Sequence, residues 1–111
     1  MRMRQAREFQ AVREQGRRAT NGCMIMNWKT LPEGATSKLG VITSRKLGNA
    51  VVRARARRLL RETFRLHQHD FQSPVAMVLV ARNSIAGKLL SAVEKDFLLL
   101  AHWAKLIQPQ G

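Results

Sequence analysis

The residues best suited to chemistry in this chain are arginines, and many of them gather near its middle. A guanidinium group donates two parallel hydrogen bonds to a phosphate and can stack on an exposed base. Arginines recur there at intervals of four, at Arg53, Arg57, Arg61 and Arg65. On a helix this spacing stacks like charges, and only Glu62 opposes them nearby. A face that only had to be soluble would mix its charge signs, so we predict contact with nucleic acid.

The composition also indicates a polyanionic partner. Twenty lysines and arginines against seven acids give a formal net charge of +13. Such an excess repels itself in a compact fold, which favours binding to nucleic acid. No membrane association is expected, because the sequence has neither the apolar length to span a bilayer nor a signal-peptide pattern. With Cys23 as its single cysteine, the chain can form no intrachain disulfide, and we expect a reduced, cytoplasmic protein.

The sequence predicts no catalytic or metal site in the protein itself. Phosphodiester hydrolysis would need clustered carboxylates for metal ions, or a histidine pair placed for acid–base work. The seven acids form no compact motif, and His67 and His69 are two residues apart. On a helix that spacing points the two imidazoles to different sides. We therefore expect no cofactor bound by the protein alone, no metal ligands and no small-molecule substrate.

The arginine-rich segment is expected to be one helix in a single domain over residues 1–111. Apolar spacing predicts a first helix over 4–15, ended by Gly16, and a long helix over 50–68, capped by Asn49. Residues 22–30 and 38–44 are predicted to be the arms of a hairpin. Residues 75–81 form an unbroken apolar run, typical of a strand buried on both faces. One further short strand fits within residues 22–44 without fixed ends, and a last helix covers 88–107.

On a helical wheel the long helix divides into two arcs. The apolar arc, expected to face the core, consists of Val52, Ala56, Leu59, Leu60, Thr63 and Leu66. The basic arc, expected to face RNA, consists of Arg55, Arg57, Arg58, Arg61 and Arg65, with Arg53 at its edge. Phe9 has two interpretations. It is either a core side chain of the first helix or a stacking platform at the rim of a single-strand groove.

Residues 45–62 carry a longer pattern than charge alone. Arg45-Lys46 is followed by Gly48-Asn49-Ala50-Val51, then by Arg53-Ala54-Arg55, Arg57-Arg58 and Arg61-Glu62. This order resembles the signature of the bacterial ribonuclease P protein family, in which a basic pair precedes Gly-Asn-Ala-Val, an Arg-Asn-Arg triplet and Arg-Glu. Phe9-Gln10 with Gly16, and Val78-Leu79-Val80-Ala81-Arg82, are similar to the first helix and late strand of that family. The resemblance covers essentially the whole chain.

The resemblance implies an α+β two-layer sandwich of order αβββαβα, with a left-handed βαβ crossover as in ribosomal-protein-like RNA-binding domains. It also implies a subunit of an endoribonuclease that removes the 5′ leader of precursor tRNA, with catalysis in a partner RNA that uses magnesium. The implied partners are ribonuclease P RNA and precursor tRNA. The implied contacts with the catalytic RNA are Arg45, Lys46, Asn49, Arg53, Arg55, Arg57, Arg58, Arg61 and Arg65. The implied lining of the leader cleft is Phe9, Arg13 and Met26.

Three positions depart from the family pattern. Ala54 stands in the middle of the Arg-Asn-Arg triplet, and Arg13 and Met26 stand where aromatic residues are common. Each missing aromatic platform would weaken leader binding by about 1–3 kcal/mol, and Arg13 would offset part of this through phosphate contact or guanidinium stacking.

Two other functions compete with this interpretation. A structural ribosomal-type RNA-binding protein would share the basic helix but not require the Gly-Asn-Ala-Val spacing. A self-sufficient nuclease would depend on His67 or His69 and would cleave RNA without an RNA partner.

Overall fold

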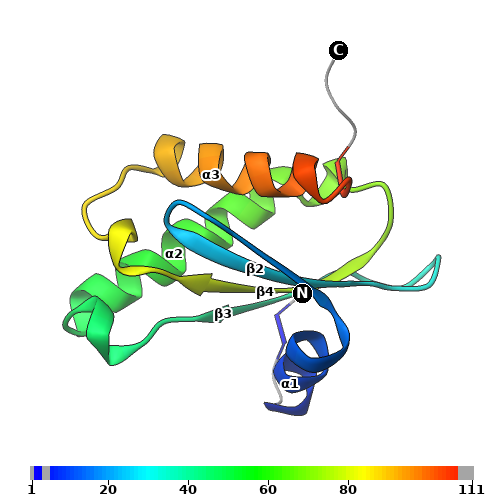
Figure 1. Ribbon diagram of the computed structural model, residues 1–111, viewed down its shortest axis with the longest axis horizontal. Coiled ribbons are helices and arrows are strands. Elements are labelled where there is room, and N and C mark those ends of the chain that lie inside the picture. The colour runs from blue at the N-terminus through cyan, green and yellow to red at the C-terminus, as the bar shows by residue number, and fades with distance from the viewer. Residues whose placement is uncertain (1, 4–5, 108–111) are drawn as a thin grey trace.

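The computed structural model describes residues 2–3 and 6–107 (Figure 1). Three helices and four strands follow one another as α1 (Ala6–Gln15), β1 (Arg17–Asn21), β2 (Met24–Thr30), β3 (Lys38–Ile42), α2 (Ala50–His67), β4 (Val75–Ala81) and α3 (Leu90–Trp103). Short 3₁₀ turns cover Arg45–Leu47, Gln68–Asp70 and Asn83–Ile85. The αβββαβα order that the resemblance implies is confirmed. The further short strand was expected within residues 22–44, but the third strand is β1, which lies ahead of them at Arg17–Asn21.

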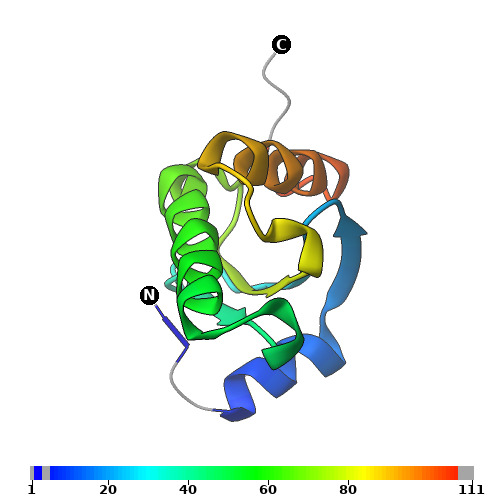
Figure 2. The ribbon, with the colours of Figure 1, turned by 90° about the vertical axis from the view of Figure 1, so that its left-hand side faces the viewer.

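The four strands form one mixed sheet in the order β1-β2-β4-β3. β4 lies between β2, to which it is antiparallel, and β3, to which it is parallel. Because β4 has a strand on each side and helices over both faces, nearly all of its side chains are buried. The parallel β3–α2–β4 connection is the crossover that the resemblance implies, and Figures 1 and 2 show it as left-handed.

The predicted hairpin of residues 22–30 with 38–44 is wrong. β2 pairs with β1 instead, through a tight turn at Gly22, and the strand that β3 pairs with is β4. Residues 38–44 alternate apolar side chains and residues 23–26 are apolar without a break, and neither pattern specifies which neighbouring strand each arm will pair with. The continuous apolar run of β4 takes the central place, because only there are both of its faces covered.

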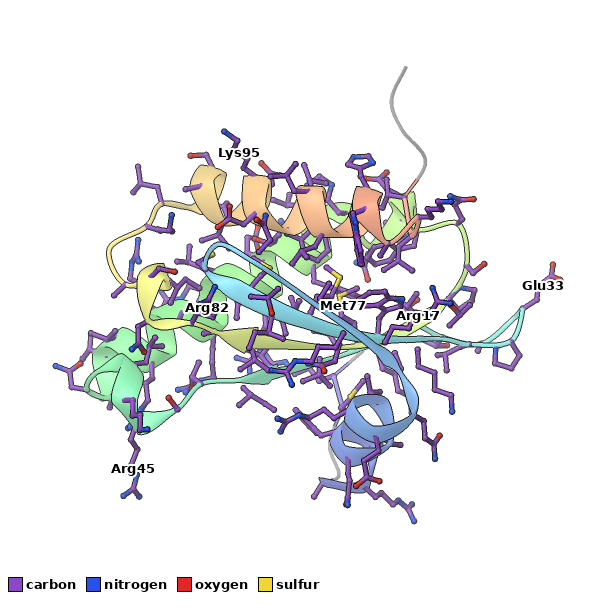
Figure 3. All side chains as sticks on the ribbon, viewed as in Figure 1. Arg17, Glu33, Arg45, Met77, Arg82 and Lys95 are labelled. Carbon is purple, nitrogen blue, oxygen red and sulfur yellow. The ribbon has the colours of Figure 1, made fainter. Side chains whose placement is uncertain are left out.

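The helices cover the sheet unequally. α2 and α3 pack together on one face, and α1 lies alone on the other (Figure 2). The larger core lies under α2 and α3, and Met77, labelled in Figure 3, is fully buried there. The smaller core lies under α1, where Val12 packs with Val78 and Met3. Alternate residues of β4 therefore serve two separate cores.

The buried face of α2 is rotated relative to the predicted apolar arc. Ala56, Leu60 and Thr63 are buried as expected, but Leu66 is 44% exposed, and Phe64, outside that arc, is buried. Phe64 contacts the ring of Phe71 with a centroid distance of 5.6 Å. The helical wheel could not predict the burial of Phe64, because Phe71 comes close to α2 only when the chain folds.

Two polar contacts also join separate elements of the fold. His67, at the end of α2, lies with its Nε2 2.7 Å from a carboxylate oxygen of Glu94 on α3 and its Nδ1 3.1 Å from one of Asp70. His67 therefore holds two helices together and does not pair with the exposed His69. Farther along α3, Asp96 accepts a hydrogen bond from the backbone N–H of Cys23. Burial first, and then Asp96, raise the pKa of the Cys23 thiol to about 12.

Candidate nucleic-acid interface

The basic loop before α2 is held by one buried side chain. Leu47 is 7% exposed and anchors the turn, whereas Arg45 and Lys46 are exposed. Figure 3 shows Arg45 pointing away from the fold at the end of the molecule where β3 leaves the sheet. The positive charges of Arg45 and Lys46, which were predicted to contact RNA, are therefore exposed to solvent on a turn that Leu47 holds in place.

Asn49 begins α2 as its N-cap. Its side-chain Oδ1 accepts a hydrogen bond from the backbone N–H of Val52 at 3.0 Å. The preceding Gly48 has φ +148°, and a Cβ there would lie 3.0 Å from the side chain of Val52. The predicted cap is therefore confirmed, and it explains part of the Gly-Asn spacing by backbone geometry.

Substitutions at Asn49 should separate capping from RNA contact. We expect Asn49→Ala to lower the free energy of unfolding by about 1 kcal/mol, because Val52 N–H loses its partner. Asn49→Ser should keep the cap and lose little stability. Urea denaturation of both variants measures this effect. Equal destabilisation of both would contradict it, and weaker RNA binding by the serine variant would assign Asn49 a contact of its own.

Four arginines on one side of α2 meet a fifth from the N-terminus. Arg57, Arg58, Arg61 and Arg65 line a shallow depression of about 500 Å³ together with Arg2, Ala54 and Glu62. Arg2 reaches this place because its backbone bridges to Leu39 at the outer edge of β3. We call these five arginines the arginine cluster. Arg2 was not predicted to join these residues, because its position depends on a strand contact that no local sequence pattern indicates.

The arginine cluster carries an unbalanced charge. Partial burial, followed by the neighbouring charges of Arg2 and Arg57, lowers the pKa of Arg61 from its ordinary value. Glu62 is paired with Arg65, whose Nε donates to it at 3.0 Å. Three guanidinium groups therefore repel one another beside a single carboxylate that is already engaged. A phosphate backbone placed across the cluster would relieve this repulsion.

The other predicted arginines of α2 lie outside the cluster. Arg55 donates from Nη2 to the backbone oxygen of Lys88 at 2.6 Å, on the flank of α2 next to the 83–88 turn. Arg53 is partly buried. Arg57, within the cluster, also donates from Nη1 to Thr43 at 2.9 Å. The predicted basic arc is thus divided, with Arg55 tied to the fold on one flank and the arginine cluster on the other.

A second depression lies between α1 and the sheet. It has a volume of about 420 Å³, and its lining residues are Ala6, Phe9, Gln10, Arg13, Glu14, Arg18 and Asn27. We call it the α1 groove. It brings together Phe9 and Arg13, two of the residues predicted for a leader cleft. Phe9 has an edge of its ring over Gly40, where an added Cβ would lie 2.5 Å from a ring carbon.

The prediction that Met26 lines the cleft is wrong. Met26 is fully buried in the core under α2 and α3. Side chains alternate along a strand, so the next residue, Asn27, faces α1 and lines the α1 groove instead. Asn27 is 3% exposed, and its amide donates to the backbone oxygen of Val78. The sheet wall of the groove is therefore polar and carries no aromatic ring from β2.

Within residues 2–3 and 6–107, no group of three His, Cys, Asp or Glu side chains is placed to hold a metal ion. The same part of the chain contains no helix long and apolar enough to cross a membrane. It has a basic α+β fold with the arginine cluster centred on α2 and a groove lined by an aromatic ring and arginines. These features define a small basic protein of the kind that binds nucleic acid.

Comparison with known proteins identifies the family. The family model for ribonuclease P matches residues 1–105. The ribonuclease P protein component of Brevibacillus brevis is 33% identical over 108 residues, which cover 96% of this chain and 85% of the relative. That of Desulfatibacillum aliphaticivorans is 37% identical over 83 residues, 75% and 70% of the two chains. This chain belongs to the ribonuclease P protein family, and is thus a protein subunit of the ribonuclease P ribonucleoprotein.

Solved structures agree with the fold. The ribonuclease P protein of Staphylococcus aureus superposes with a TM-score of 0.85 at 23% identity, over 96% of this chain and 97% of that one. The protein from Thermotoga maritima gives a TM-score of 0.78 at 23% identity, over 100% and 99% of the two chains. The α+β architecture predicted from the sequence is therefore confirmed by the structure and by its neighbours.

Proposed function

We propose that this protein binds the catalytic RNA of ribonuclease P through the arginine cluster and the Arg45–Asn49 loop, and the 5′ leader of precursor tRNA in the α1 groove. Its contribution to tRNA 5′-end maturation is electrostatic and positional, because it screens the repulsion between two RNAs and holds the leader near the cleavage site. Bond cleavage belongs to the RNA and its magnesium ions. The proposal places the chain in the cytoplasm with both RNA partners.

The observation that carries the proposal is the presence of two separate binding surfaces of different chemistry. The arginine cluster is a dense patch of like charge on α2, suited to a folded RNA backbone. The α1 groove is smaller and pairs the ring of Phe9 with Arg13 and Arg18, suited to single-stranded nucleotides. Two such surfaces on one small protein allow two RNA elements to be held together.

Magnesium dependence tests the proposal. We expect the protein to restore precursor-tRNA cleavage by its cognate ribonuclease P RNA at a magnesium concentration where the RNA alone is inactive, because protein cations replace part of the ionic screening. Single-turnover cleavage rates with and without protein measure this rescue. Phe9→Ala should weaken binding of a precursor with a leader more than binding of mature tRNA.

Two results would contradict the proposal. The absence of rescue at every magnesium concentration would remove the functional role. Recovery of ribosomal RNA, in place of ribonuclease P RNA, with the protein from cells would favour a structural ribosomal role.

A further inference from the structure

A third depression lies on the opposite side of β1 from the α1 groove. It is formed between Arg18–Asn21 of β1 and Leu99, Leu100 and Trp103 of α3, and has a volume of about 530 Å³. We call it the α3 groove. Neither the arginine cluster nor the α1 groove accounts for it.

The α3 groove exposes apolar side chains that a folded protein normally covers. Trp103 is 70% exposed and Leu99 is 54% exposed, one turn apart on the same face of α3. The other tryptophan, Trp28, is only 5% exposed, so the chain can bury an indole where it serves the core. Two neighbouring large apolar side chains beside a groove mark a surface that meets a partner.

The charges around the groove favour an anionic partner. Arg18 of β1 lines the groove and is exposed, and the exposed Arg17 precedes it on the same strand, where Figure 3 labels it. No carboxylate is among the side chains that line the groove in the described part of the chain. Asp96, one turn before Leu99, is engaged by the backbone N–H of Cys23 at 3.0 Å. An exposed indole beside guanidinium groups is the combination that single-stranded nucleic acid uses for stacking and phosphate contact.

The α3 groove and the α1 groove adjoin at one residue of the sheet edge. Arg18 lines both depressions. In Figure 2 the blue strand β1 runs along one border of the molecule, from α1 below to α3 above. An RNA strand that leaves the α1 groove therefore meets Arg18 at the edge of the sheet and then the α3 groove.

A second copy of this chain is the main competing occupant, because β1 is an edge strand of the sheet. Edge pairing of two copies would bring the Arg17 and Arg18 side chains of both together. Charged residues on an edge strand oppose such pairing. RNA, by contrast, is attracted by the same two residues.

We propose that the α3 groove binds leader nucleotides that lie farther from the cleavage site than those in the α1 groove, with Trp103 stacking on a base and Arg17 and Arg18 contacting phosphates. This inference rests on the proposed function, since it extends the path of the same leader. It assigns a role to the β1 edge and to the exposed end of α3 in distinguishing long leaders from short ones.

The test compares two precursor tRNAs bound by the reconstituted holoenzyme, one with a leader of about 4 nucleotides and one with about 12, the range that single-strand grooves cover. We expect Trp103→Ala to weaken binding of the long-leader precursor about 10-fold and to leave the short-leader precursor unchanged. Trp103→Phe should retain most of the affinity, because it keeps an aromatic ring. Leu89→Ala, at a side chain equally exposed at 70% outside the groove, is the matched control.

The outcomes separate this inference from the proposed function. If Phe9→Ala weakens both precursors and Trp103→Ala weakens neither, the α3 groove is not part of the leader path, although the α1 groove is. If Phe9→Ala affects neither precursor, the leader-binding part of the proposed function itself fails. If Trp103→Ala instead abolishes self-association measured by sedimentation, the occupant is a second copy, and the RNA assignment is overturned.

Discussion

Replacing Arg58 and Arg61 together by glutamine is expected to weaken binding to ribonuclease P RNA by about 150-fold or more, because each charged hydrogen bond contributes about 1.5–3 kcal/mol and two are lost. The plot of log affinity against log salt should become shallower by about 2, because two fewer phosphates are neutralised in the complex. Filter binding or fluorescence titration over a range of salt concentrations measures both quantities.

The same substitution is expected to leave the fold as stable as before, or more stable. Burial and the charges of Arg2 and Arg57 lower the pKa of Arg61, so its positive charge is unfavourable in the folded protein. Removing that charge relieves the repulsion without opening a cavity in the core. Lower affinity with an unchanged or higher melting temperature would therefore show that binding, and not folding, is impaired.

The matched control removes two positive charges elsewhere. Lys29 and Lys95 are exposed and lie outside the arginine cluster. The variant Lys29→Gln with Lys95→Gln has the same net charge as the cluster variant and should bind RNA nearly as well as the unaltered protein, since distant exposed charges are screened. Equally weakened binding in the two variants would show that the RNA responds to net charge and not to the arginine cluster.

Gly16→Ala is expected to lower the free energy of unfolding by about 3 kcal/mol or more. An added Cβ would lie 2.3 Å from the backbone oxygen of Trp28 and 2.5 Å from that of Val12. Both oxygens belong to the backbone, one in β2 and one in α1, so neither can move away by rotating, as a side-chain atom could. Thermal or urea denaturation measures the destabilisation.

Gly34→Ala is the control for this prediction. Gly34 has φ +87° but nothing within 4 Å of an added Cβ, so only backbone strain of about 1 kcal/mol opposes the substitution. Equal destabilisation by the two variants would contradict the close-approach argument. Because Gly16 joins α1 to β1, relief of its clash would also move Phe9 and Arg13 relative to Arg18, and leader binding should fall with stability.

The elements with strong internal patterns could be predicted from the sequence. The apolar run of β4 and the Asn49 cap of α2 both depend on neighbouring residues and were found where expected. β1 was not delimited, because Arg17–Asn21 is polar and lies at an exposed edge of the sheet. β1 is a strand because it pairs with β2, and the composition of residues 17–21 alone does not indicate that pairing.

The candidate site was predictable in its residue types but not in its geometry. The resemblance gave Phe9 and Arg13 as neighbours, and the α1 groove contains both. The prediction that Met26 lines the groove was wrong, because a shift of one residue along a strand moves a side chain to the other face of the sheet. Arg2 and Trp103 were missed for a different reason, since each gains its surroundings from a strand distant in sequence.

The central place of β4 has a consequence for synthesis of the chain. β2 and β3 do not pair with each other, and the strand that joins them ends at Ala81. During translation the sheet therefore cannot close until residue 81 has left the ribosome, by which time the whole of α2 has already emerged. The arginines of α2 are therefore exposed to cellular RNA before the core that positions them has formed. Folding must then be faster than binding of the unfolded segment to other RNAs.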